Sequence, residues 1–93
     1  MKLDIVHDQE DFRFYAPLGD EEAEMTYTYP EEKVLDLDYT FIPEAYRNQG
    51  LADQLVKAGL DFVQAQGYQF IPSCPVVEAY VQRHPEYQSL MKE

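Results

Sequence analysis

Hydrophobic and polar residues alternate in three stretches of the first half of the chain, and this alternation predicts three β-strands. The side chains on one face of these stretches are Phe12 and Phe14, then Ala23, Met25, Tyr27 and Tyr29, and then Leu35, Leu37, Tyr39 and Phe41. Because successive side chains of a strand point to opposite faces, each stretch fits a strand with one face on a core. A further short strand from Leu3 to His7 is more weakly indicated. The connectors at 17–22 and 30–33 are short and turn-like, so the three strands are expected to form an antiparallel meander.

The apolar spacing changes to that of a helix after Gly50. One stripe of this segment carries Ala52, Leu55, Val56, Gly59, Leu60 and Val63. Polar residues such as Asp53 and Lys57 face away from the stripe. Gly67 stands where a helix commonly ends with a residue in the left-handed conformation. The pattern therefore predicts a helix from about Leu51 to Gln66.

The remaining elements predict a crossover and a second helix. The run YQFIP reads as a short strand that Pro72 ends, and a strand–helix–strand order places it parallel to the Val34–Phe41 strand. Ser73 or Cys74 can cap the next helix, with Pro75 in its first turn. Its apolar face consists of Val76, Val77, Tyr80 and Val81, and Pro85 ends it. The chain is thus expected to be a single domain, 1–93, of mixed α/β class, with a short last turn in its tail.

Charge and composition narrow the function. The 93 residues include 7 Lys and Arg against 18 Asp and Glu, a net charge of −11. This argues against nucleic acid and anionic membranes as partners, and it suits a cationic partner or substrate, or simply solubility. A charged N-terminal stretch does not read as a signal peptide, no apolar run approaches the roughly 20 residues of a membrane span, and the single cysteine fits a reducing, cytoplasmic location.

The loop at 47–52 carries the clearest candidate chemistry. A helix N-terminus presents unpaired N–H groups and a partial positive charge. Gly50 and Ala52 are small enough for a diphosphate to approach the backbone, and Asn48 tolerates unusual backbone angles. Arg47 adds a planar fork of donors. The loop can therefore bind an anion, although Gly50 alone could merely start the helix. Neither a GK[ST] phosphate loop nor a GxGxxG motif is present.

Arg47-x-x-Gly50-x-Ala52 resembles the acyl-CoA-binding signature [QR]-x-x-G-x-[GA] of the GNAT superfamily of acetyltransferases. The runs LDLDYTFIPEAYRNQGLADQLVKAGLDFVQAQG and IPSCPVVEAYVQRHPEY resemble the short YjdJ-type, GNAT-like N-acetyltransferase-domain proteins. The resemblance is close over the second half of the chain and lies in the strand pattern over the first half. It implies a minimal GNAT fold, an antiparallel meander followed by a parallel crossover and a C-terminal helix. Tyr39, where that family commonly has histidine, and Asn48 and Gln49, where its loop is richer in glycine and arginine, are departures.

The resemblance also implies a co-substrate and the residues that hold it. Acetyl-CoA is the expected acetyl donor, with an amine as acceptor, either a small molecule or a protein lysine. The residues expected to bind CoA are Thr40, Phe41 and Ile42 of the strand before the loop, and Arg47, Asn48, Gln49, Gly50, Leu51 and Ala52. Backbone N–H groups of 40–42 would polarise the thioester carbonyl.

Two residues are candidate catalytic groups. Tyr80 lies where the superfamily often has a tyrosine near the CoA sulfur, so it could act as an acid, or it could be a core tyrosine. Cys74 precedes a helix, whose N-terminus could make it nucleophilic, or it could be a small buried hydrophobe. His84 fits a helix C-terminus at least as well as a base, and His7 is assigned no role. Asp36 and Asp38 could receive a cationic amine or form a solvated strand face, and no zinc-type ligand spacing is present.

The sequence therefore leaves two functions open. The first is an acetyl-CoA-dependent N-acetyltransferase that works by direct attack of an amine. The second is a non-catalytic acyl-CoA-binding or protein-interaction module on the same fold.

Overall fold

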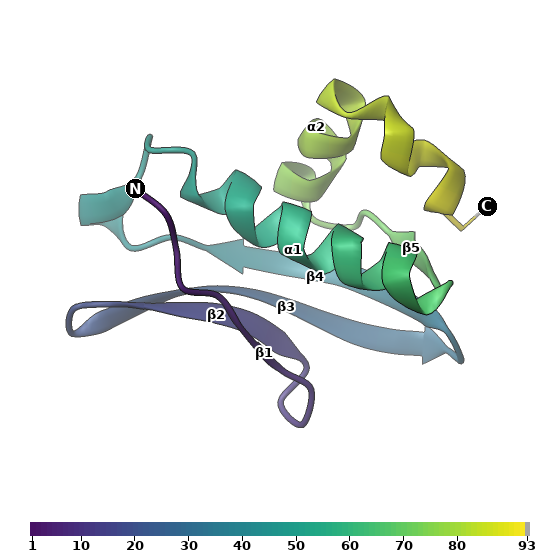
Figure 1. The fold of residues 1–93 in the computed structure, drawn as a ribbon, viewed down its shortest axis with the longest axis horizontal. Coiled ribbons are helices and arrows are strands. Elements are labelled where there is room, and N and C mark those ends of the chain that lie inside the picture. The colour runs from purple at the N-terminus through teal and green to yellow at the C-terminus, as the bar shows by residue number, and fades with distance from the viewer. Residues whose placement is uncertain (93) are drawn as a thin grey trace.

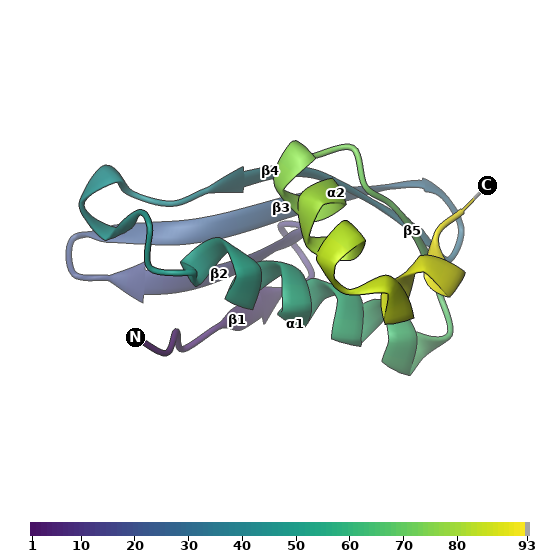
Figure 2. The same cartoon turned by 90° about the horizontal axis from the view of Figure 1, so that it is seen from above.

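The computed structural model describes residues 1–92, which form one mixed sheet with helices on a single face (Figures 1 and 2). The strands are β1 Val6–Asp8, β2 Arg13–Leu18, β3 Glu21–Glu31, β4 Val34–Phe41 and β5 Gln69–Ile71. The helices are α1 Leu51–Gln66 and α2 Pro75–Arg83, and two 3₁₀ segments, η1 Glu44–Tyr46 and η2 Pro85–Leu90, follow β4 and α2.

The order of the strands in the sheet is their order in the chain, β1-β2-β3-β4-β5. β1 to β4 pair antiparallel, and β5 pairs parallel to β4 after α1 has crossed over the sheet. The predicted meander and parallel crossover are thus confirmed. A parallel connection needs such a crossover, because its two strands start at the same end of the sheet.

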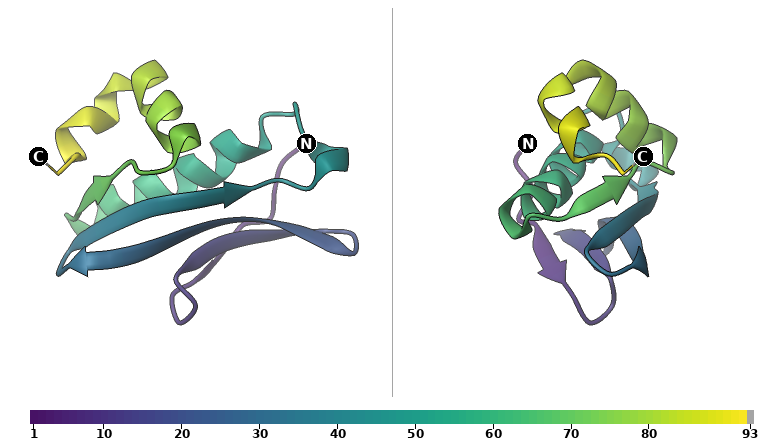
Figure 3. Two further views of the ribbon diagram at one scale, coloured as in Figure 1. Left: turned by 180° about the vertical axis from the view of Figure 1, so that it is seen from behind. Right: turned by 90° about the vertical axis from the view of Figure 1, so that its right-hand side faces the viewer.

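Both helices lie on one face of the sheet, where α1 packs against the strands and α2 packs against α1, and the opposite face carries no helix (Figure 3). The largest fully buried side chains include Tyr27, Phe70, Met25, Leu35, Leu37, Leu55 and Leu60. Each such aliphatic side chain contributes about 1.5–3 kcal/mol through its removal from water. The helical residue Gly59 is also buried, and a Cβ at that position would lie 2.5 Å from the Met25 side chain. This close approach lets α1 lie directly on β3.

The prediction for the first strand was wrong at Phe12. This residue precedes β2, has a left-handed backbone (φ 54°) and is 47% exposed. The inward face of β2 consists instead of Phe14, Ala16 and Leu18. The early strand is also shifted, since β1 begins at Val6 rather than at Leu3.

The alternation predicted for β4 breaks at Asp38. Tyr27 pairs with Leu37, whereas the preceding Thr26 pairs with Tyr39, so β4 holds one extra residue. Such a bulge reverses which face each later side chain occupies. Tyr39 and Phe41, expected on the core face, are therefore 49% and 38% exposed.

The later elements agree closely with the pattern. α1 spans Leu51–Gln66, and Gly67 ends it with a left-handed backbone (φ 70°). α2 begins after Cys74, carries Pro75 at its first position and ends before Pro85. Cys74 occupies the N-cap position, but its side chain makes no capping hydrogen bond. Among residues 1–92, no helix is both long and apolar enough to cross a membrane.

His7, to which the sequence assigned no role, lies in an aromatic cluster. Its ring stacks on Phe14 at 3.9 Å between centroids and meets Phe62 edge-on. Its Nε2 lies 2.6 Å from the Tyr27 hydroxyl. Burial lowers the pKa of His7 below 6.5, with Asp8 opposing part of the shift. Burial likewise raises the pKa of Tyr27, to about 12. The folded protein therefore favours the neutral imidazole.

This shift predicts a pH-dependent stability. Below pH 6.5 the unfolded chain binds a proton at His7 more readily than the folded chain does, so the free energy of unfolding falls as the pH drops. His7→Phe keeps the ring stacking and removes this titration. The melting temperature of the variant relative to that of the wild type is expected to rise as the pH falls from 7.5 to 5. His84→Gln is the control, and a difference for His7→Phe that stays constant with pH would contradict the account.

Candidate active site

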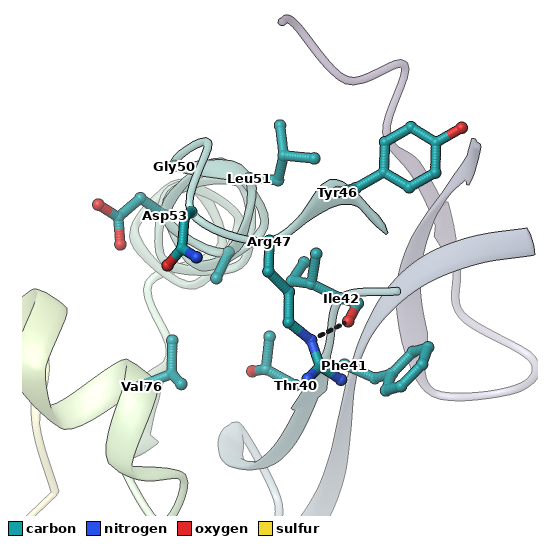
Figure 4. Close-up of a pocket in the computed structure, with 11 residues that line it drawn as sticks. Thr40, Phe41, Ile42, Tyr46, Arg47, Gly50, Leu51, Asp53 and Val76 are labelled. Atoms are coloured by element: carbon teal, nitrogen blue, oxygen red, sulfur yellow. Dashed lines mark hydrogen bonds between the residues drawn. The ribbon is translucent and has the colours of Figure 1, made fainter. Parts of the chain in front are cut away.

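A cavity of about 390 Å³ opens between the end of β4, the loop after it and the start of α1 (Figure 4). Its lining residues are Thr40, Phe41, Ile42, Tyr46, Arg47, Asn48, Gly50, Leu51, Ala52, Asp53 and Val76. Eight of the nine residues expected to bind a cofactor are therefore brought together, and Gln49 is the exception.

The strand side of the cavity forms because β4 extends beyond the end of its parallel neighbour, β5. The pairing with β5 covers only Val34 to Asp36. The N–H of Cys74 then donates to the carbonyl of Leu37 at 2.9 Å, and α2 leads the chain away from the sheet. The last residues of β4 thus separate from the second half of the crossover. The bulge at Asp38 places Thr40 opposite the buried Met25, on the helix-covered face.

The loop side of the cavity has two left-handed residues, Asn48 (φ 65°) and Gly50 (φ 74°). Gly50 is the N-cap of α1, and no side chain of residues 1–92 caps this helix end. A Cβ on Gly50 would meet nothing within 4 Å, so its conformation and not its packing favours glycine. The N–H groups of a first helical turn have no intrahelical partner. The N–H groups at the start of α1 lie beside the cavity.

Arg47 reaches across the cavity toward β4. Its Nε donates to the carbonyl oxygen of Ile42 at 2.9 Å, and its guanidinium lies near Thr40 and Phe41 (Figure 4). The side chain is exposed to solvent. One fixed cation therefore stands at the mouth of a cavity in a chain whose net charge is −11.

Asp53, which sequence reasoning placed on the outer face of the helix, is a lining residue that was missed. Its two carboxylate oxygens accept hydrogen bonds from the two terminal nitrogens of Arg83, each at 3.0 Å. These bonds lower the pKa of Asp53, against an opposing effect of burial. Arg83 belongs to α2 and is 30 residues away in the chain, so no local sequence pattern indicates the Asp53–Arg83 ion pair. The ion pair ties the last turn of α2 to the first turn of α1.

Cys74 lies next to the cavity but does not line it. The residue is 6% exposed and belongs to the hydrophobic core. Its Sγ donates to the Oγ1 of Thr40 at 3.6 Å, and Thr40 does line the cavity. The side chain of Thr40 therefore stands between the Cys74 thiol and the cavity.

Tyr80 also lies outside the cavity lining. It is 4% exposed and stacks on His84 with 4.1 Å between ring centroids. The guanidinium carbon of Arg83 lies 5.7 Å from its ring centroid. Burial raises the pKa of the Tyr80 hydroxyl. On α2 it is instead Val76, four residues earlier, that reaches the cavity. The catalytic roles suggested for Tyr80 and Cys74 stay predictions.

The fold and the site together define the class of protein. A mixed sheet with a late parallel crossover, a β4 that separates from β5, and the signature Arg47-x-x-Gly50-x-Ala52 at the start of the crossover helix belong to N-acetyltransferases of the GNAT type. The chain is a member of the family described as GCN5-related N-acetyl-transferase, whose model matches residues 13–90.

Relatives agree with this membership, and a solved structure has the same fold. Protein NATD1 of chicken (Gallus gallus) is 32% identical over 85 residues, which cover 89% of this chain and 77% of that protein. Protein NATD1 of human (Homo sapiens) is 33% identical over 83 residues, 87% of this chain and 74% of that protein. The NMR solution structure of a GCN5-like protein from Staphylococcus aureus superposes with a TM-score of 0.76 at 22% identity, covering 97% of this chain and 88% of that one.

Within residues 1–92, no three His, Cys, Asp or Glu side chains are grouped so that they could hold a metal ion. The polar side chains that line the cavity are those of Thr40, Tyr46, Arg47, Asn48 and Asp53.

The burial of Cys74 predicts a slow thiol. Because Cys74 is the only cysteine, the release of a chromophore by an aromatic disulfide reagent reports on this residue alone. The folded protein is expected to react at least about tenfold more slowly than the denatured chain, since access limits the reaction of a buried thiol. Equal rates for the folded and the denatured protein would show that Cys74 is accessible.

Proposed function

We propose that this protein is an acetyl-CoA-dependent N-acetyltransferase, and that the first turn of α1 binds the diphosphate of CoA. One observation supports the proposal above all others. The helix end at Gly50 has no side-chain cap and faces a cavity that is also lined by the separated end of β4. A helix N-terminus favours an anion through its free N–H groups and its dipole.

The residues around Gly50 fit a diphosphate in size and charge. Gly50 and Ala52 present little side chain, so phosphate oxygens can approach the backbone. The open space above Gly50 leaves room for this approach. Arg47 can add a charge-assisted hydrogen bond from a terminal guanidinium nitrogen while its Nε holds the Ile42 carbonyl. Such a local site does not require a positively charged protein.

The acyl end would lie along Thr40, Phe41 and Ile42. In acetyl transfer, the neutral amine nitrogen attacks the thioester carbonyl, the C–N bond forms, the C–S bond breaks, and the amine proton is lost while the CoA thiolate gains one. Backbone N–H groups at the end of β4 would stabilise the negative charge on the carbonyl oxygen. Water in the open cavity would accept the amine proton, because the lining carboxylate, Asp53, is held by Arg83.

Direct attack by the amine is better supported than a route through acetyl-cysteine. A covalent route needs the Cys74 thiol to reach the thioester carbon. In the structure this thiol is buried behind Thr40. The acceptor is a small amine or a protein lysine.

A non-catalytic acyl-CoA-binding or protein-interaction module is the second candidate. It is favoured by the positions of Cys74 and Tyr80, both of which are buried outside the cavity lining. A cavity whose lining includes neither Cys74 nor Tyr80 could bind CoA and transfer nothing.

Thermal shift followed by thiol release tests the proposed function. A ligand at a hundred times its Kd stabilises a protein by about 2.7 kcal/mol, which raises the melting temperature of a domain of this size by on the order of 10 °C. Acetyl-CoA and CoA are both expected to produce this shift, and free CoA should appear when acetyl-CoA is mixed with a panel of amines and lysine peptides. Stabilisation without thiol release from any amine would favour the non-catalytic module, and no stabilisation would overturn both functions.

Arg47 gives a matched pair of variants. Arg47→Glu places a negative charge beside the phosphates and is expected to weaken CoA binding roughly tenfold or more, which is about 1.4 kcal/mol. Arg47→Gln removes the charge but keeps a side chain that the signature allows, so its loss should be smaller. Isothermal titration calorimetry measures both affinities. If Arg47→Glu binds CoA as tightly as wild type, Arg47 is not part of the site.

A further inference from the structure

We infer that Arg83 is a positioning residue for the CoA site, and that it acts by holding and neutralising the carboxylate of Asp53. The inference rests on the proposed binding of the CoA diphosphate at the first turn of α1. The geometry that suggests it is the two-fold hydrogen bonding between the two side chains, at 3.0 Å for each oxygen of Asp53.

Asp53 is an unexpected residue for the wall of an anion site. It is the third residue of α1 after the cap Gly50, and it lines the cavity. A carboxylate in this turn competes with a bound anion in two ways. Its charge repels phosphate, and its oxygens can accept hydrogen bonds from the same helix N–H groups.

Arg83 opposes both effects. Its charge offsets that of Asp53, and its two terminal nitrogens occupy both carboxylate oxygens. In Figure 4 the Asp53 carboxylate is turned away from Arg47. The helix amides are thereby left for a ligand.

The Arg83 side chain is itself held in place by α2. Its Nε donates to the carbonyl of Ala79 at 3.3 Å, and its guanidinium carbon lies 5.7 Å from the centroid of the Tyr80 ring. Three of its five N–H groups are thus engaged within the protein. The buried Tyr80 therefore supports the ion pair.

A double-mutant cycle separates this role from simple docking of α2. CoA affinity is measured by calorimetry at low ionic strength for wild type, Arg83→Gln, Asp53→Asn and the double variant. Arg83→Gln is expected to weaken binding roughly five- to tenfold, because an unpaired carboxylate then lies near the diphosphate. Asp53→Asn should bind at least as tightly as wild type. The double variant should return to within about twofold of wild type, although it lacks the ion pair as Arg83→Gln does.

Two controls accompany the cycle. Lys92→Gln makes the same change of net charge, and Lys92 pairs with Glu31 at the opposite end of β4. Its CoA affinity should not change. Raising the salt concentration should reduce the deficit of Arg83→Gln, because salt screens the repulsion.

The outcomes distinguish the inference from the function on which it depends. If wild type does not bind CoA, the proposed function fails. If wild type binds and Arg83→Gln binds equally well, the inference alone fails. If the double variant is as weak as Arg83→Gln, then Arg83 either contacts the ligand or merely docks α2, and the inference is again overturned. Melting temperatures of all four proteins report any loss of folding.

Discussion

The uncapped N-terminus of α1 is the feature on which the account of this protein depends. Polar N–H groups at a helix end need partners, and Ser, Thr, Asp and Asn side chains are strongly preferred at the N-cap to supply them. Here the N-cap is Gly50 in a left-handed conformation, and the only carboxylate of the first turn, Asp53, is bound by Arg83. The structure thus leaves these donors to solvent or to a ligand. An acidic chain can bind an anion at such a helix N-terminus, because the attraction between the anion and the free N–H groups is local.

The end of β4 forms the part of the cavity wall that α1 does not supply. One extra residue at Asp38 turns Thr40 toward the helices and Tyr39 and Phe41 toward the open face of the sheet. The early end of β5 and the departure of α2 then separate β4 from its parallel neighbour. A ligand whose anionic part sits at α1 can therefore extend along the backbone of β4. The cavity therefore depends on the topology of the sheet as much as on any single side chain.

Regular elements could be predicted from the sequence, whereas their irregularities could not. α1 was predicted with its observed bounds because its apolar stripe and Gly67 are local signals. The bulge could not be predicted because Tyr39 and Phe41 continue the alternation of hydrophobic and polar residues in the sequence. In the structure both side chains face solvent. Eight of the expected binding residues meet in one cavity since they lie within thirteen consecutive residues, 40–52. The Asp53–Arg83 pair and the contacts of His7 with Tyr27 and Phe62 depend on long-range packing, which no short window of sequence contains.

The binding of a diphosphate at α1 is most directly tested by the backbone amide resonances of the labelled protein during a titration with CoA. CoA is expected to cause the largest shifts at residues 47–53 and smaller shifts at 40–42. Pantetheine, which lacks the diphosphate, should move the resonances of 40–42 and leave those of the first turn of α1 nearly unchanged. Amides of 47–53 that stay in place at saturating CoA, or that respond equally to pantetheine, would contradict the account.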